Sequence, residues 1–428
     1  MLERLRQLWN VRELRNKILF VLGMLVIFRI LAHIPIPAID AAGLKSFLSG
    51  NPLLGLLNLF SGGGLENFSI VMLGVGPYIT ASIIMQLLTM IVPKLEAIQK
   101  DGESGQAKIN QYTRYLTLPM ALLQGFSTLT FLRQQAGGAS VLGAISPFDM
   151  VVALAAILGG TMLLMWIGEL ISEKKVGNGI SLLIFAGIIA QLPQSVQQTV
   201  SVIDQTQILT IVSFLVIGLI TIAGVVFVTE GQRNIPVTYA KRAIGTSSMG
   251  GVNTHLPLRV NQAGVIPIIF AVSIILFPPL IAQFFTTSAT PWIANLAVWV
   301  RDFFQNQTYY GLMYFILVVA FTYFYTAVVF QPQQIAENLQ KQGGFIPGIR
   351  PGTPTAHYLS YVSNRIILGG ALFLGLIAVL PTILQSFSNM QSIAIGGTSL
   401  LIVVSVVLEM LKQVQAQLVM RDYESFYK

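Results

Sequence analysis

Long uncharged runs of apolar residues recur along the chain and determine its predicted architecture. A helix needs about 20 apolar residues to cross the hydrocarbon core of a bilayer, so runs that approach this length predict transmembrane helices. Ten runs qualify, at residues 18–34, 70–92, 116–131, 150–171, 180–192, 208–228, 265–285, 309–330, 366–384 and 393–410. The pattern therefore predicts an all-α integral membrane protein with ten transmembrane helices.

The segment between the first two spans departs from this pattern. Residues 51–69 read NPLLGLLNLFSGGGLENFS, which is apolar but too short to cross a bilayer and is interrupted by Gly62, Gly63 and Gly64. Non-helical backbone is tolerated at membrane depth only where protein or a water-filled cavity surrounds it. We therefore expect a re-entrant half-helix here, inserted from the outer side. Pro77, in the first turn of the next span, lacks a backbone donor and favours a bent element.

Lysine and arginine collect on one side of the predicted spans. The loops of one side carry only Lys45, Arg133 and Arg301, Arg29 lies within the first span, and the rest of the 25 basic residues lie on the other side. Because basic loops are retained in the cytoplasm, this distribution places both termini there. It also accounts for most of the net charge of +8, which on a soluble chain would favour nucleic-acid binding.

Five spans precede the loop at residues 191–207 and five follow it. Because five is odd, the second half (198–428) would lie in the membrane with the opposite orientation from the first half (1–197). This is the arrangement of an inverted repeat, in which a central pathway often lies between the halves. Two cytoplasmic loops, at about 230–262 and 331–364, are longer than a connection between neighbouring spans requires and are candidate docking surfaces.

The composition argues against metal, nucleotide and thiol chemistry. The chain has no cysteine, and its three histidines, His33, His255 and His357, are too far apart in sequence to form a local metal-ligand pattern. The phosphate-binding pattern GxxxxGK[ST] does not occur. We expect no metal, no cofactor and no catalytic residues, so the energy for any transport must come from a partner.

The placement of ionisable residues bears on two alternative functions. Coupled carriers usually keep ionisable side chains near the bilayer midplane. Here Arg29, Glu169 and Glu409 lie near the ends of their spans, from which they can extend to the interface, and the midplane offers neutral groups such as Thr80 and Gln86. This disfavours an inverted-repeat secondary transporter, which remains the alternative, along with a structural or lipid-organising membrane scaffold.

Nine distinctive stretches are spread over nearly the whole chain: FRILAHIPIPAIDA from Phe28, NLFSGGGL from Asn58, PYITASIIMQLLT from Pro77, DGESGQAKINQYTRY from Asp101, GNGISLLIFAGI from Gly177, EGQRNIPVTYAKR from Glu230, THLPLRVNQAGVIPIIFA from Thr254, GGFIPGIRPG from Gly343 and GGTSLLIVV from Gly396. In sequence and in order, these stretches resemble the SecY/Sec61α family of protein-conducting channel subunits.

The resemblance implies two five-span halves around an hourglass channel. A ring of aliphatic side chains would form the constriction: Val75, Ile79, Ile180, Ile184, Ile269 and Ile402. A plug at residues 53–66 would close the outer funnel, with Leu57, Asn58, Phe60, Ser61, Gly62, Gly63 and Gly64. A lateral gate would open toward lipid where the second span meets the seventh, through a polar contact of Thr80, Gln86 and Asn261, with Phe277 nearby.

The resemblance also implies a function and partners. It indicates a non-enzymatic channel of the bacterial inner membrane that passes unfolded secretory polypeptides across the membrane and releases hydrophobic segments into lipid. The implied partners are SecE, SecG, the SecA motor ATPase, the translating ribosome, signal sequences and nascent chains. Arg350, held among glycines and prolines, is the best candidate for a contact with SecA or the ribosome, and Lys241 and Arg242 are weaker candidates.

Overall fold

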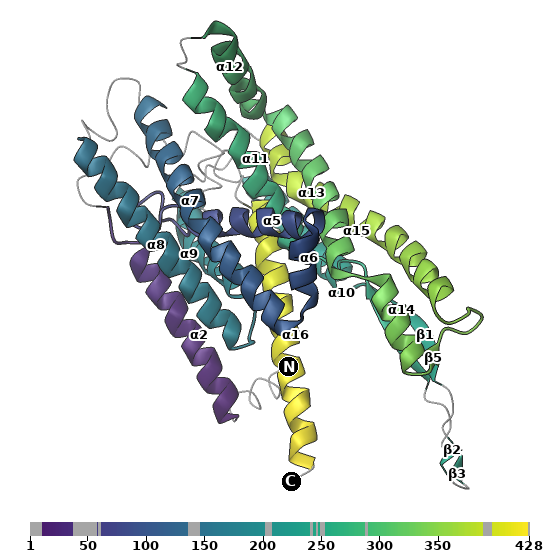
Figure 1. Cartoon of the computed structure of the whole chain (residues 1–428). Coiled ribbons are helices and arrows are strands. Elements are labelled where there is room, and N and C mark those ends of the chain that lie inside the picture. The colour runs from purple at the N-terminus through teal and green to yellow at the C-terminus, as the bar shows by residue number, and fades with distance from the viewer. Residues whose placement is uncertain are drawn as a thin grey trace.

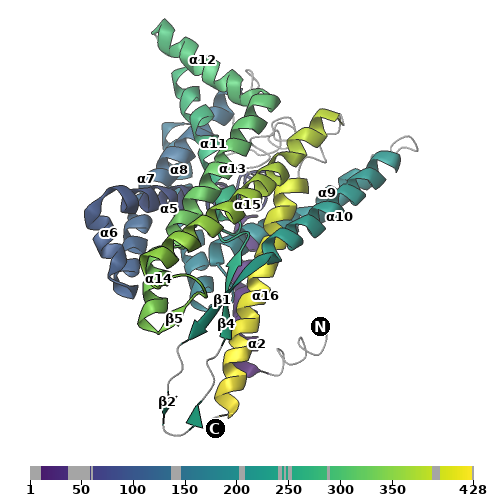
Figure 2. The ribbon, with the colours of Figure 1, turned by 90° about the vertical axis from the view of Figure 1, so that its right-hand side faces the viewer.

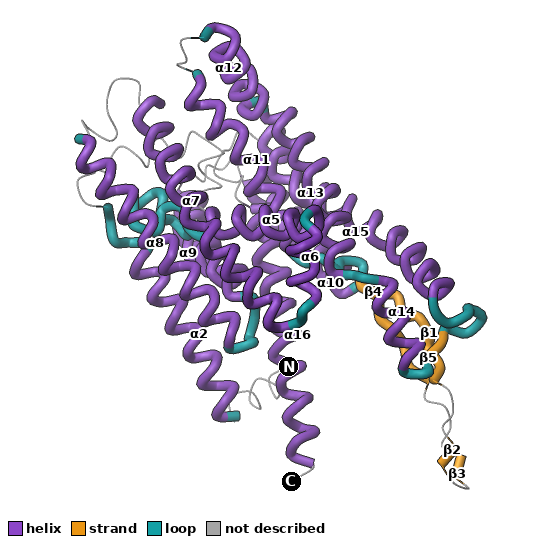
Figure 3. Tube along the Cα trace, in the orientation of Figure 1, coloured by secondary structure: helices purple, strands orange, loops and turns teal. Residues whose placement is uncertain are grey.

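A computed structural model of the chain shows a bundle of long helices with one small sheet at one end (Figure 1). The structure describes residues 11–36, 58, 61–135, 146–201, 208–239, 243–244, 247–248, 253–286, 290–387 and 396–426. Coloured by secondary structure, the described residues are mostly helical, and the strands lie at one end of the molecule (Figure 3). The predicted all-α membrane fold is confirmed, with the small sheet as an addition.

The first half contributes six described helices. They are α2 (Arg12–Leu31), α5 (Gly76–Ile91), α6 (Pro93–Lys100), α7 (Glu103–Gln135), α8 (Pro147–Glu173) and α9 (Gly179–Ser201). Two glycines let α8 and α9 approach closely, because a Cβ added at Gly179 would lie 1.8 Å from the carbonyl oxygen of Gly168. Gly160 of α8 likewise faces backbone, with an added Cβ 2.0 Å from the carbonyl oxygen of Ile70.

The second half contributes seven described helices. They are α10 (Ile208–Glu230), α11 (Ile266–Phe285), α12 (Pro291–Gln305), α13 (Gln307–Val329), α14 (Pro332–Lys341), α15 (Thr353–Phe387) and α16 (Gly396–Phe426). Each of the ten predicted apolar runs overlaps one of these helices, although residues 70–92 do so only from Gly76, and α6, α12 and α14 are additional. α12 is amphipathic, with Trp292, Leu296 and Trp299 exposed on one face and Ala297 and Phe304 buried. Exposed tryptophans on such a face are typical of a helix at the membrane surface.

The second predicted span is wrong as a single helix over residues 70–92. Residues 61–75 form successive turns, α5 begins only at Gly76, and the chain bends by 101° between α5 and α6. The turns require positive φ at Gly62, Gly63 and Gly74, and Pro93 forces Val92 into an extended conformation that ends the helix. In Figure 1, α5 lies across the direction of its neighbours α7 and α8.

Among the described residues, five helices are long and apolar enough to cross a membrane, and the bent pair α5–α6 would make a sixth. The five include α7, α8, α13, α15 and α16, and α9, α10 and α11 hold shorter apolar helical stretches. The chain is therefore a multi-pass membrane protein, with several helices below the length of a straight span. The shortness of the fifth predicted span is reproduced, since its apolar stretch is Gly179–Pro193.

The two long loops of the second half fold together. Strands β1 (Gln232–Tyr239), β4 (Asn253–Arg259) and β5 (Gly344–Phe345) form an antiparallel sheet in the order β4-β1-β5, and β2 (Ala243–Ile244) pairs with β3 (Ser247–Ser248). The sheet packs with α14 and the first turns of α15 around a separate apolar core: Ile235, Val237, Leu258, Leu339, Ile346, Leu359 and Val362. The two candidate docking loops are thus one folded surface.

Figures 1 and 2 show which elements share an end of the bundle. The start of α2, the end of α16 and the sheet lie at one end, and α12 lies at the other. This agrees with an even number of crossings, because both ends of the described chain then lie on the same side. It also puts the basic loops at the end that the positive-inside rule assigns to the cytoplasm.

Candidate functional site

The central apolar core joins side chains of both halves. Five of the six residues predicted to line a constriction are buried in this one cluster: Val75, Ile79, Ile184, Ile269 and Ile402. The sixth, Ile180, is partly buried and packs against it. The predicted ring residues, which are spread over more than 300 positions of sequence, are therefore brought into one cluster.

Local sequence positions each of these side chains. Val75 caps α5, and its carbonyl accepts from the backbone N–H of Ile79, which puts the two residues one turn apart. Ile180 and Ile184 lie one turn apart at the start of α9. The side-chain oxygen of Asn178 accepts from the backbone of Ile180 at 3.1 Å and of Ser181 at 3.2 Å, so it caps this helix.

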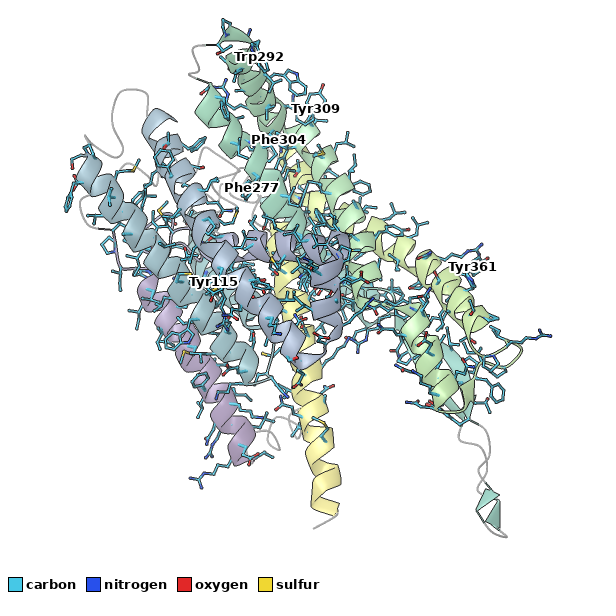
Figure 4. All side chains as sticks on the ribbon, viewed as in Figure 1. Tyr115, Phe277, Trp292, Phe304, Tyr309 and Tyr361 are labelled. Carbon is cyan, nitrogen blue, oxygen red and sulfur yellow. The ribbon has the colours of Figure 1, made fainter. Side chains whose placement is uncertain are left out.

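The halves meet along two seams beside this cluster. On one seam α11 packs against α5 and α7, and on the other α16 packs against α9. The first seam encloses a cavity of about 40 Å³ that Thr80, Gln124, Ser273 and Phe277 help to line. Figure 4 labels Phe277 on the side of α11 that faces the first half, and the cavity lining agrees. Two residues assigned to the lateral gate, Thr80 and Phe277, thus face one cavity from opposite halves.

The polar contact expected from Thr80, Gln86 and Asn261 is not formed between the halves. Thr80 donates to the carbonyl of Gly76 at 3.1 Å and accepts from Gln124 of α7 at 3.2 Å, so both of its partners are in its own half. The expected contact is therefore not seen among the described residues, where Thr80 bonds one turn back along its own helix and to α7, and the gate assignment stays a prediction.

The other two residues of that contact also bond locally. Gln86 donates to Ser82 at 3.4 Å, and Asn261 donates to the carbonyl of Gly264 at 3.2 Å. The buried side-chain oxygens of Gln86 and Asn261 have no hydrogen-bond partner among the described residues. Their membership of a gate stays a prediction.

Part of the predicted plug lies within the described residues. Leu57 and Phe60 lie outside them, whereas Asn58 and Ser61 to Gly64 are described, and we call Asn58 together with residues 61–66 the plug segment. Asn58 is helical and residues 61–64 form turns. The side chain of Asn58 accepts from the backbone of Glu66 at 2.9 Å, and Ser61 donates to the carbonyl of Asn58 at 3.1 Å. Short polar side chains thus close the segment upon itself.

The plug segment is seated between α2 and α9. An added Cβ at Gly62 would lie 2.7 Å from the ring of Phe28 and 3.1 Å from the Cα of Gly187. Arg29 of α2 donates to the carbonyl of Gly62, and Gln191 of α9 donates to the carbonyl of Asn58 at 3.1 Å. Sequence reasoning treated Arg29 as a residue that extends to the interface and did not single out Gln191. No sequence signal pairs either one with a distant backbone carbonyl.

The end of α2 is also tied to the turns that follow the plug segment. Asn67 donates to the carbonyl of Ala32 at 3.3 Å, and Pro35 pairs with Ser69 in an isolated antiparallel bridge. Ile36 donates to the carbonyl of Phe68 at 2.9 Å, and Ile70 donates to that of Ile34 at 3.1 Å. These contacts fix where the segment re-enters the bundle.

Of the residues predicted to contact SecA or the ribosome, Arg350 lies on the folded loops of the second half. Arg350 is exposed in the turn between β5 and α15, and Gly348 and Gly352 on either side have positive φ. The carbonyl of Arg350 accepts from the hydroxyl of Thr355 at 2.9 Å, which fixes the backbone while the guanidinium faces solvent. Lys241 and Arg242 lie outside the described residues. Among the described residues, no three His, Asp or Glu side chains come together as a metal site.

Comparison with known proteins decides the family. The SecY family model matches residues 69–411. The chain belongs to the SecY family. The protein translocase subunit SecY of Streptomyces coelicolor is 45% identical over 445 aligned residues, with 100% of both chains covered. The corresponding subunit of Mycobacterium tuberculosis is 42% identical, with 97% of each chain covered.

Solved structures of SecY and Sec61 share the fold. A protein-conducting channel superposes with a TM-score of 0.62 at 17% identity, covering 93% of this chain and 91% of that one. A SecY whose plug domain stabilises the closed state of its channel gives 0.61 at the same identity and coverage. Sec61 of a canine ribosome-channel complex gives 0.58, again at 17% identity and with the same coverage. At this identity the likeness shows the fold alone.

Proposed function

We propose that this SecY-family chain is the channel through which unfolded secretory polypeptides cross a bacterial plasma membrane. The observation that carries the proposal is the aliphatic cluster at the junction of the two halves, to which both halves contribute the residues expected to form a constriction. The name of the relatives, protein translocase subunit, supports the same activity.

The chemistry of the cluster suits a channel for polypeptides rather than ions. A narrow passage lined by aliphatic side chains offers no oxygen ligands to replace the hydration shell of an ion, and it tends to exclude water. The same side chains form no hydrogen bonds that would distinguish one amino acid from another. An extended polypeptide of any sequence can therefore displace these side chains. Ions do not enter the passage when it holds no polypeptide.

The seam between α5 and α11 is the proposed exit toward lipid. Thr80 and Phe277 face one small cavity there, and a cavity marks a place where packing is already incomplete. A hydrophobic signal segment inserted at this seam would replace side-chain contacts by contacts of similar strength, because its residues are as apolar as those it separates. Hydrophobic segments then leave sideways and hydrophilic ones pass through.

The force for movement is proposed to come from partners. We place SecA and the ribosome on the cytoplasmic surface formed by the sheet, α14 and the turn that carries Arg350, with Lys241 and Arg242 as further contacts. SecE and SecG would bind the chain within the membrane. Both termini would be cytoplasmic and the protein itself would be non-enzymatic, made of halves 1–197 and 198–428.

Reconstitution tests the proposal directly. The purified chain with SecE and SecG is incorporated into liposomes, and SecA, ATP and an unfolded secretory precursor are added outside. We expect the precursor to become protected from added protease in an ATP-dependent way, while liposomes without the chain give no protection. Lack of protection under conditions in which the Streptomyces coelicolor subunit succeeds would refute the proposal, and ion-driven uptake of small solutes by the same liposomes would favour a secondary transporter.

A further inference from the structure

We infer that Arg29 and Gln191 fasten the plug segment in the closed channel and set the threshold at which the channel opens. The inference rests on the proposed channel function and assigns two positioning residues to it. The contacts concerned are the hydrogen bonds from Arg29 to the carbonyl of Gly62 and from Gln191 to the carbonyl of Asn58. We call these two bonds the plug clamp.

The clamp holds backbone rather than side chain. The carbonyls of Asn58 and Gly62 belong to turns whose geometry depends on positive φ at Gly62 and Gly63. Gly62 has no room for a side chain, since an added Cβ would collide with Phe28 of α2 and approach Gly187 of α9. The plug segment therefore packs closely against both helices at Gly62, and its carbonyls accept from the two donors.

The Arg29 side chain has few alternative hydrogen-bond partners. It lies on the wall of an open groove of about 890 Å³, with Leu22, Val26 and Ile30 of its own helix and Ala186 of α9 among the lining residues. The carbonyl of Gly62 is its only side-chain hydrogen-bond acceptor within the described part of the chain, where it also forms no salt bridge. A charged donor in apolar surroundings binds its acceptor tightly, because losing the acceptor leaves the charge poorly solvated.

The clamp joins the plug segment to the first half alone. α2 and α9 belong to that half, as does the bond from Asn67 to the carbonyl of Ala32. Opening by separation of the two halves therefore does not break the clamp by itself, and release of the plug segment is a second event. A translocating chain must displace the segment from Arg29 and Gln191 before the aliphatic constriction is unobstructed.

Weakening the clamp should shift the equilibrium toward the channel without a seated plug segment in the absence of substrate, because the clamp stabilises only the state in which that segment is seated. Arg29→Met keeps the length and apolar character of the side chain and removes the donor. We expect about a tenfold rise in the basal halide permeability of proteoliposomes, which corresponds to about 1.4 kcal/mol. Gln191→Leu removes a neutral donor and should raise the permeability less, because a bond from a charged donor is roughly twice as strong.

A second readout separates a positioning role from general damage. An added charge in the signal segment disfavours its insertion at the apolar seam, so such a precursor should open the channel poorly. Arg29→Met should translocate this precursor better than the unmodified protein does. A variant that merely disturbs folding would translocate every precursor less well. Arg29→Lys retains a charged donor and should return both the permeability and the selectivity against defective signals toward the original values.

Arg301→Met is the matched control. It removes an arginine of α12 at the same end of the molecule whose partner is Asp302 of its own helix, with no bond to the plug segment. Its halide permeability should equal that of the unmodified protein. The inference is overturned if the halide permeability of Arg29→Met equals that of the unmodified protein. It is also overturned if Arg29→Met raises the permeability no more than Arg301→Met does. If Arg29→Met cannot be purified in folded form, the same comparison is decided by Gln191→Leu.

The two proposals fail in different ways. If the unmodified protein does not translocate an intact precursor with SecA and ATP, the channel function fails. In the other case the unmodified protein translocates the precursor, while the clamp variants have the same halide permeability and the same selectivity against defective signals as the unmodified protein. The channel function then stands and the clamp fails.

Discussion

The close approach of α8 and α9 gives a sharp test of how the constriction is held. The two helices touch backbone to backbone where Gly179 meets Gly168, and Ile180 and Ile184 follow directly on α9. Gly179→Ala would put a methyl group 1.8 Å from the carbonyl oxygen of Gly168. Because neither backbone can rotate away as a side chain can, the helices themselves must separate.

The required movement follows from the distance. A Cβ essentially never lies closer than 3.0 Å to such an atom, so the contact must lengthen by at least the difference between 3.0 and 1.8 Å, about 1.2 Å. Overpacking of this kind costs about 1–3 kcal/mol. It also moves the start of α9, and with it Ile180 and Ile184, away from its packed position. We expect a lower melting temperature and a higher basal halide permeability.

Two other glycines of α8 provide a graded series. Gly159→Ala meets nothing within 4 Å and should leave permeability unchanged, with stability equal or slightly higher because alanine favours helix. Gly168→Ala would place a methyl 2.6 Å from the Cδ1 of Ile180, a flexible side-chain end that can rotate, so its effect should be intermediate. Melting temperatures come from purified protein in detergent, and permeabilities from halide-sensitive dye in proteoliposomes. Equal values for Gly179→Ala and Gly159→Ala would refute the reasoning.

Three further predictions concern the other parts of the site. In this chain without native cysteine, the double variant Thr80→Cys, Phe277→Cys should form a disulfide across the cavity. The disulfide should stop precursor translocation until reductant is added. Full translocation activity with the disulfide formed would exclude a gate at this seam. Arg350→Glu should lower SecA-driven translocation at least tenfold without changing membrane insertion of the protein. Lys94→Glu, a charge reversal at an exposed residue of α6 outside the proposed partner surface, should have little effect, and equal activities of the two variants would show that Arg350 is misassigned. Ile402→Asn puts an amide into the apolar cluster and should raise halide leak by favouring water in the passage; an unchanged leak would place Ile402 outside the constriction.

The sequence predicted the helices well because long apolar runs have only one satisfactory backbone in a membrane. It was less successful where the backbone is broken. The run from Ile70 reads as continuous helix, yet the chain turns until Val75, where Gly74 has a positive φ that a helix does not allow. The bend before Pro93 could have been predicted from the residue type, whereas its angle of 101° depends on packing against α7.

The candidate site, too, was predicted from the sequence only in part. The resemblance to the family supplied the aliphatic residues that the fold brings into one cluster, but no periodicity could have selected them among so many isoleucines. The roles of Arg29 and Gln191 could not be predicted from the sequence. Their partners are backbone carbonyls, which every residue type has. The sequence also did not indicate that Thr80 would bond to an acceptor one turn away on its own helix, and the gate contact stays a prediction.

The two seams between the halves differ in their polar contacts, and the difference indicates where the channel opens. Beside α11, the polar side chains of the cavity bond within their own halves, Thr80 with Gln124 and Ser273 with the carbonyl of Ile269. Beside α9, Gln417 of α16 accepts from Lys17 of α2 at 3.3 Å and donates to the carbonyl of Lys175, so its one side chain makes two bonds across the halves. Separation beside α11 breaks apolar contacts that lipid or a signal segment can replace, whereas separation beside α9 also breaks hydrogen bonds. The halves should therefore part at α5 and α11 and pivot near α9 and α16.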